Sequence, residues 1–264
     1  MKKTIIFSLL LLTAFSAGAT EQTNDKIHID GVEWELLDKP LHFTEIEFDV
    51  LSYLHPLITM WEAHQKGYTA TWNIKNNELV LESVDNVPQD TLKSFFKKEG
   101  YNSYAASWLS STIRAKQGEC IYSDLKGRRQ NYESELNVII AKGEIIDLYF
   151  YHNKVLTDGF ALTGTNIDDE KNLNEKFPID LNNYPDLKGK RVGISISDIN
   201  VDPCGNLTNY RFQLIGTNMS NTQYMQLEQD IKNALHNITW KTILINGEVK
   251  PYTSSFVFPY GFIE

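Results

Sequence analysis

The sequence contains little cysteine and an excess of acidic residues. Two cysteines in 264 residues cannot build a disulfide scaffold, and 25 Lys and Arg against 34 Asp and Glu give a net charge of −9. A nucleic-acid binder needs a basic face to meet phosphates, so this charge argues against nucleic acid as a partner, and it also disfavours docking on anionic lipid. The composition, 42% hydrophobic and 22% charged, is that of ordinary globular proteins and argues against extensive disorder.

Long hydrophobic runs are scarce, and the one at the N-terminus has the layout of a secretory signal peptide. Met1–Lys3 is a short positive start, Thr4–Phe15 is apolar, and Ala17–Ala19 supplies small residues before a polar stretch. The apolar stretch is too short to cross the hydrocarbon core, which needs about 20 residues. We therefore predict a signal peptide at residues 1–19, a periplasmic or secreted protein, and no stable membrane span after cleavage.

Export leaves two interpretations of the cysteines. In an oxidising compartment Cys120 and Cys204 could form a disulfide, which would stabilise the fold by about 2–4 kcal/mol in the chain-entropy model. They could equally be two unrelated thiols, because the sequence does not give the distance between them. Both alternatives remain open at this point.

The rest of the chain divides into two modules. Residues 166–188 lack a periodic pattern of apolar residues, are dominated by Asn, Asp, Glu and Lys, and contain two prolines. Such a composition is typical of a connection between domains. We predict an α+β protein with a mostly β N-terminal domain over residues 20–165. The polar linker 166–188 then leads to a small β-β-α-β domain over residues 189–264.

The C-terminal module has the clearest periodicity. Val192–Ile196 and Tyr210–Leu214 alternate apolar and polar residues, which predicts the two strands of a hairpin. Ser220 and Gln223 form a candidate capping box, and apolar residues then recur at three- and four-residue spacing, which predicts a helix. A strand, a tight turn and a last strand complete the prediction: Thr242–Ile245, Asn246–Gly247 and Ser254–Phe258.

The end of this module resembles a known family. Trp240-Lys241, the turn Asn246-Gly247 and the closing run Phe256–Phe262 are similar to the closing signature of TonB C-terminal domains. The resemblance implies a helix on one face of a three-stranded sheet, whose last strand lies at the edge and pairs with an extended peptide. TonB also has a membrane anchor and a Pro-rich spacer, for which we find no counterpart in this sequence, so the resemblance concerns fold and binding mode.

The resemblance implies binding by strand addition at the last strand. An edge strand offers unpaired N–H and C=O groups to an envelope protein or peptide, and Pro259 is expected to end the ladder because it lacks an N–H. The alternative is that the sheet closes on itself, on the N-terminal domain, or on a second copy to give a homodimer. The predicted binding residues are Ser254, Ser255, Phe256, Val257 and Phe258.

The N-terminal module is predicted to be mostly β. The predicted strands are Val32–Leu36, Ala70–Ile74, Leu79–Leu81, Leu136–Ile140 and Ile145–Tyr151, and the predicted helices are Phe48–His64 and Pro88–Lys98. Gly67–Lys75 resembles a Gly-Tyr-x-Ala-x-Trp-x-Ile motif of an uncharacterised family of bacterial proteins, and two later segments resemble further motifs of that family. The family implies no activity.

Motifs for metal, cofactor or nucleophilic chemistry are missing. The sequence has no HExxH, no C-x-x-C, no Gly-rich phosphate loop and no G-x-S-x-G, so we predict neither a metal nor a cofactor. Arg114, Tyr132 and Glu133 lie in the family-like motifs and could build a small pocket for an anionic group, because Arg pairs well with carboxylates. The alternative is a structural ion pair beside a core tyrosine.

The sequence therefore predicts a non-enzymatic exported protein that binds a protein or peptide through its C-terminal domain. The alternative is a hydrolase or carbohydrate-binding protein with its site in the N-terminal domain, where Trp61, Trp72 and Trp108 could stack on sugars. Core packing explains these aromatic residues more simply. A third possibility is a structural role in an envelope complex.

Overall fold

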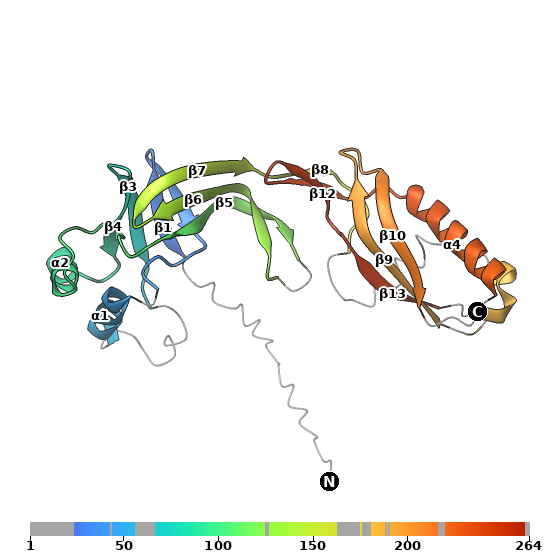
Figure 1. The fold of residues 1–264 in the computed structure, drawn as a ribbon, viewed down its shortest axis with the longest axis horizontal. Coiled ribbons are helices and arrows are strands. Elements are labelled where there is room, and N and C mark those ends of the chain that lie inside the picture. Colours follow the sequence, from blue (N-terminus) through green and yellow to red (C-terminus); the bar gives the residue numbers. More distant parts are fainter. Residues whose placement is uncertain are drawn as a thin grey trace, which may run out of the picture.

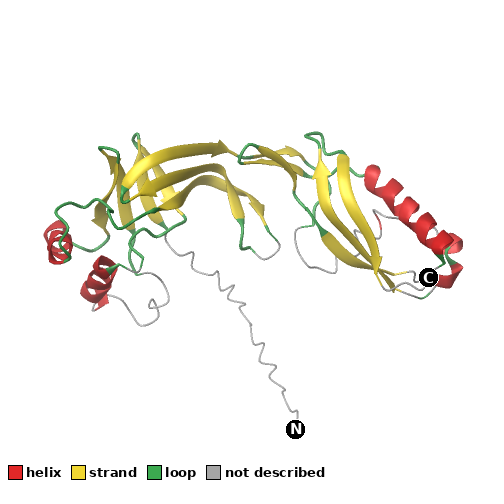
Figure 2. Ribbon diagram, in the orientation of Figure 1, coloured by secondary structure: helices red, strands yellow, loops and turns green. Residues whose placement is uncertain are grey.

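A computed structural model describes residues 24–42, 44–55, 67–124, 127–162, 175, 181–187, 189, 191–215 and 220–261. The protein is α+β and mostly β, as predicted. Figures 1 and 2 show an elongated molecule with a barrel at one end and a second lobe at the other. The predicted signal peptide and most of the predicted linker lie outside the described residues.

The barrel has seven strands in the order β1-β2-β5-β6-β7-β4-β3. Parallel pairing of β1 with β3 closes it, whereas β4 and β7 share only the pair Glu78 and Glu144. Trp72 and Leu136 are fully buried inside, and polar neighbours alternate with such residues along the strands. The five strands predicted here are confirmed. The bounds are β1 Asp25–Ile29, β2 Val32–Leu36, β3 Ala70–Lys75, β4 Glu78–Val84, β5 Ser111–Ser123, β6 Gln130–Ala141 and β7 Glu144–His152.

Two helices pack together beside the barrel (Figure 1). Helix α1, Glu45–Leu54, begins where the Thr44 side chain accepts a 3.1 Å hydrogen bond from the backbone N–H of Glu47. It confirms the first part of the helix predicted at Phe48–His64, of which residues 56–64 lie outside the described part. Helix α2, Gln89–Lys98, confirms the second prediction.

The second lobe is built on a three-stranded antiparallel sheet with the order β10-β9-β13. Leu227, Ile231 and Leu235 of helix α4 are buried in one cluster with the inward-facing residues of β9, so the helix covers one face of the sheet (Figure 1). The capping box of Ser220 and Gln223 is present. The predicted hairpin and helix are confirmed. The bounds are β9 Arg191–Val201, β10 Leu207–Ile215, α4 Asn221–His236 and β13 Phe256–Gly261.

A third sheet bridges the two lobes. It has the order β12-β11-β8, with β8 at Lys154–Thr157, β11 at Thr242–Ile245 and β12 at Glu248–Pro251. Strand β8 follows directly on β7, so a strand that leaves the barrel pairs with one that follows α4 (Figure 1).

Residues just before the predicted linker, and residues at its C-terminal end, take part in the second core. Phe160 and Trp240 meet edge to face with ring centroids 5.2 Å apart, and Leu162 is buried beside them. Two short 3₁₀ turns, Leu181–Asn183 and Pro185–Leu187, flank Tyr184, which is fully buried and donates a 2.7 Å hydrogen bond to Asp230. The described residues just before the predicted linker and residues 181–187 at its C-terminal end therefore pack into the second lobe.

The last strand differs from its prediction at both ends. It begins at Phe256 instead of Ser254, and it continues through Pro259 to Gly261. The expectation that Pro259 ends the ladder is wrong, because a proline whose nitrogen faces away from its neighbour removes no hydrogen bond from the sheet. No helix among the described residues has the length and hydrophobicity that a membrane crossing requires.

Candidate functional site

The outer edge of β13 is the first part of the candidate site. In the described part of the chain β13 is the last strand of its sheet and pairs only with β9, so its other edge has no described strand beside it. The Val257 side chain is 65% exposed, whereas Phe256 next to it is buried in the second core. The strand is thus anchored on one face and accessible at its edge.

The register of β13 identifies which backbone groups face outward. Opposite residues of an antiparallel pair alternate between pairs that exchange two hydrogen bonds and pairs that exchange none. Pro259 lies opposite Gly193, and a residue without an N–H can only form a pair of the second kind. Val257, two residues earlier and opposite Ser195, is of the same kind. The N–H and C=O of Val257 therefore point away from β9 into the open edge.

The other edge of this sheet is less suited to accept a strand. Strand β10 pairs with β9 through two irregularities, between Leu207 and Asn209 and between Asn209 and Arg211, whereas β13 pairs with β9 without one. Irregular pairing twists an edge strand away from a regular ladder. The exposed Arg211 also forms a 2.8 Å ion pair with Asp198 on this side. The regular, open edge is that of β13.

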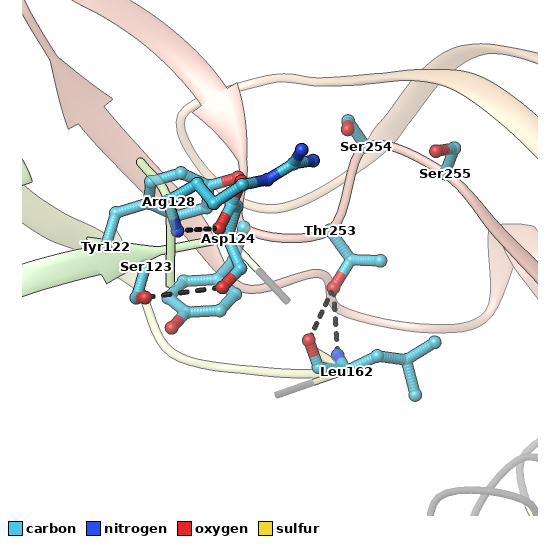
Figure 3. Close-up of a pocket in the computed structure, with 9 residues that line it drawn as sticks. Tyr122, Ser123, Asp124, Arg128, Leu162, Thr253, Ser254 and Ser255 are labelled. Atoms are coloured by element: carbon cyan, nitrogen blue, oxygen red, sulfur yellow. Dashed lines mark hydrogen bonds between the residues drawn. The ribbon is translucent and has the colours of Figure 1, made fainter. Parts of the chain in front are cut away.

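A pocket of about 200 Å³ lies where the chain enters β13. One wall comes from the end of β5 and the turn after it, and the other from the segment between β12 and β13 (Figure 3). Most of its lining side chains carry hydroxyl groups. The lining residues are Tyr122, Ser123, Asp124, Arg128, Leu162, Tyr252, Thr253, Ser254 and Ser255.

The two walls are held together by packing at their base. Tyr122 and Tyr252 meet edge to face with ring centroids 5.3 Å apart, and the Thr253 hydroxyl accepts a 2.8 Å hydrogen bond from the N–H of Leu162. Burial, together with the nearby Asp124 and Tyr252, raises the pKa of the Tyr122 hydroxyl. Tyr122 therefore stays protonated at neutral pH and can donate a hydrogen bond.

Arg128 is the one cation among the described residues that line the pocket. Its backbone N–H donates a 2.7 Å hydrogen bond to Asp124, which fixes the turn. In Figure 3 its side chain extends from that turn in the direction of Ser254. Within the described residues no ion pair or side-chain hydrogen bond engages the guanidinium. A guanidinium with its donors available, among hydroxyl groups, is suited to bind a carboxylate.

The three polar residues predicted in the N-terminal module do not form one pocket. Arg114 donates a 3.0 Å hydrogen bond to Glu135, which is 2% exposed and also accepts from the Tyr132 N–H. Tyr132 is buried, and the Lys116 ammonium lies over its ring. Glu133 instead accepts a hydrogen bond from the N–H of Glu119. The contacts are those of the structural alternative, an ion pair with a packed tyrosine.

The two cysteines are both free and exposed. Cys120 lies on β5 of the barrel, and Cys204 lies in the turn between β9 and β10 of the second lobe. The Cys120 thiol contacts the carbonyl oxygen of Tyr122 at 3.2 Å. Of the two alternatives that the sequence leaves open, the structure shows the second, in which the two thiols are unpaired.

The aromatic residues considered for sugar stacking are placed differently. Trp72 is fully buried in the barrel core, and Trp108 packs on Phe96 and Tyr101 while its ring N–H donates to the Pro40 carbonyl. Trp61 lies outside the described part of the chain. No group of three or more His, Cys, Asp or Glu side chains suited to a metal ion occurs among the residues that the structure describes.

Sequence reasoning placed Ser254 and Ser255 at a binding site but missed Arg128 and the hydroxyl residues opposite them. These residues belong to segments far apart in the chain, and no motif or spacing links them. No family model, curated protein or solved structure matches this chain. The geometry of β13 and of the adjoining pocket is therefore the basis for assigning a function.

Proposed function

We propose that this chain is an exported, non-enzymatic binding protein, in which an extended segment of an envelope protein or peptide adds to the outer edge of β13. The observation that carries the proposal is the register of Pro259 and Val257, which turns the Val257 N–H and C=O away from β9. Strand addition gains affinity from main-chain hydrogen bonds of this kind. The arrangement of hairpin, helix and last strand at the sheet edge supports the resemblance to TonB C-terminal domains.

The backbone of β13 disfavours a symmetric dimer that is centred on Pro259. Two copies of β13 paired about Pro259 would place two residues without an N–H opposite each other and lose both hydrogen bonds at the centre. A different strand can place its own N–H opposite the Pro259 carbonyl. We propose a heterologous partner, and pairing with a second copy in another register is an outcome that the test below distinguishes.

The test is photo-crosslinking in intact cells. A photoreactive residue replaces Ser255 in the full-length chain, beside the open edge, and a second chain carries it at Ile215 of β10, which is 46% exposed. We expect an adduct with an envelope protein from position 255 and not from position 215.

The decisive arm adds Val257→Pro to the chain that is labelled at position 255. This substitution removes the one outward N–H of Val257 while leaving the hydrogen bonds to β9 intact, so we expect the adduct to disappear. An adduct of unchanged yield in the folded variant would contradict binding by strand addition. A concentration-dependent dimer in sedimentation that is lost in Val257→Pro would instead identify a second copy as the occupant.

A further inference from the structure

The pocket lined by Arg128 lies at one end of the proposed binding edge. Ser254 and Ser255 line the pocket, and β13 begins at the next residue, Phe256. The Ser254 carbonyl accepts a 3.1 Å hydrogen bond from the N–H of Ile199, which fixes this corner against β9. A strand that occupies the outer edge therefore runs either into the pocket or out of it.

The direction of the added strand decides which of its ends meets the pocket. A strand antiparallel to β13 runs from Gly261 toward Phe256, so its C-terminal end arrives beside Ser255. A parallel strand would bring its N-terminal end, and hence a positive charge where that end is a free amine. The side chain available at this corner is the Arg128 guanidinium, which attracts a negative group and repels an amine.

The charged residues among the described lining of the pocket are one cation, Arg128, and one acid, Asp124. The Asp124 carboxylate accepts a hydrogen bond from the backbone N–H of Arg128, which holds it at the turn. In a chain of net charge −9 this corner thus offers an available cation and several hydroxyl donors.

The size of the pocket limits which ligands it can bind. A cavity of about 200 Å³ is smaller than the roughly 300–1,000 Å³ that encloses a drug-sized ligand. It accommodates a group the size of a peptide end and is too small to enclose a drug-sized ligand.

We propose that the pocket captures the C-terminal carboxylate of the segment that pairs with β13, through the Arg128 guanidinium and the hydroxyl groups around it. This inference rests on the proposed function and deepens it. The partner is then a protein or peptide whose extended C-terminus binds antiparallel to β13. Specificity comes from a free end as well as from main-chain pairing.

The test uses an array of random-sequence peptides, each synthesised once with a free C-terminal carboxylate and once as the C-terminal amide. It is probed with the full chain and with Arg128→Ala, Arg129→Ala and Val257→Pro. Arg129→Ala is the matched control. It removes the same charge at the neighbouring position, where the side chain does not line the pocket. Circular dichroism establishes that each variant is folded.

We expect the bound peptides to lose affinity about tenfold or more as amides, since hydrogen bonds to a charged group are of that strength. Arg128→Ala should lose a similar factor for the free-acid peptides and none for the amides, and Arg129→Ala should bind like the original chain. Val257→Pro should bind neither form.

Two results would overturn this inference while leaving the proposed function standing. One is equal binding of acids and amides that Val257→Pro abolishes and Arg128→Ala does not change. The other is binding that depends on Asp or Glu within the peptide whether or not its end is amidated, which would assign the pocket to a side-chain carboxylate. Peptide binding that Val257→Pro leaves intact would count against the proposed function itself.

Discussion

Arg114 and Glu135 form an ion pair across strands β5 and β6, with the guanidinium Nη2 3.0 Å from the carboxylate Oε1. The Glu135 side chain is 2% exposed and that of Arg114 is 42% exposed. The ion pair therefore joins the buried Glu135 carboxylate to a guanidinium that is partly exposed to solvent.

We predict that Arg114→Met lowers the free energy of unfolding by about 1–3 kcal/mol, because it leaves the buried Glu135 without its charged donor. Urea denaturation followed by circular dichroism measures the change. Arg129→Met, at an exposed position, is the control and should stay within about 0.5 kcal/mol. Equal stability of the two variants would show that the ion pair contributes nothing.

The contact between Arg114 and Glu135 also shows why sequence motifs could not predict which polar residues contact one another in the barrel. The residues Arg114 and Glu133 were chosen from motifs, but contacts across a sheet depend on register. Arg114 lies opposite Asn137, one diagonal step from Glu135, and an irregularity after Gln117 places Glu133 beside Glu119. No local pattern encodes such an irregularity.

Elements with one buried face were predicted well. Apolar and polar residues alternate along strand β9 because Ile194 and Ile196 face the core. Helix α4 begins at a capping box that four residues of sequence identify. Contacts between lobes leave no such local signature. The pairing of β8 with β11, and the pocket that joins Tyr122 to Tyr252, arise from packing between distant segments.

Gly205 is a position where a side chain cannot be accommodated. Its φ is +82°, and an added Cβ would lie 2.5 Å from the Trp240 carbonyl oxygen. Gly247, with φ +80°, has nothing within 4 Å of an added Cβ. We predict that Gly247→Ala lowers the free energy of unfolding by about 1 kcal/mol from backbone strain alone. Gly205→Ala should cost about 1–3 kcal/mol more, because the packed backbone must move. Thermal and urea unfolding measure both, and equal losses would contradict this packing.

The two thiols should react without denaturant, because Cys120 and Cys204 are both free and exposed. We expect a chromogenic disulfide reagent to titrate two thiols in the native chain and one in each of Cys120→Ser and Cys204→Ser. Titration of none in the native or unfolded chain would instead demonstrate a disulfide between them.

Asp202 gives a pH dependence with a definite sign. Hydrogen bonds from the Asn206 side chain and then from the backbone N–H of Asn206 lower the pKa of this carboxyl below 3.8. Because the folded pKa is below the unfolded one, the stabilisation is present above pH 3.8 and is lost as the pH falls through the folded pKa. Asp202→Asn cannot ionise, so its deficit in melting temperature should be present at pH 7 and shrink toward about pH 3. A deficit that does not change with pH would contradict the role of the charge.

The alternation of backbone direction along β13 can be tested by proline substitution at two adjacent positions. Phe256 lies opposite Ile196 in a pair that exchanges hydrogen bonds, whereas Val257 lies opposite Ser195 in a pair that does not. Phe256→Pro should therefore be less stable than Phe256→Ala by at least about 2 kcal/mol, through loss of a ladder hydrogen bond and a steric clash. Val257→Pro should stay within about 1 kcal/mol of Val257→Ala, because its N–H faces outward. The alanine variants remove the side-chain contribution, so each difference reports the backbone alone. If the larger loss occurs at Val257, then its N–H points toward β9, and the open edge has no donor at that residue for a partner strand.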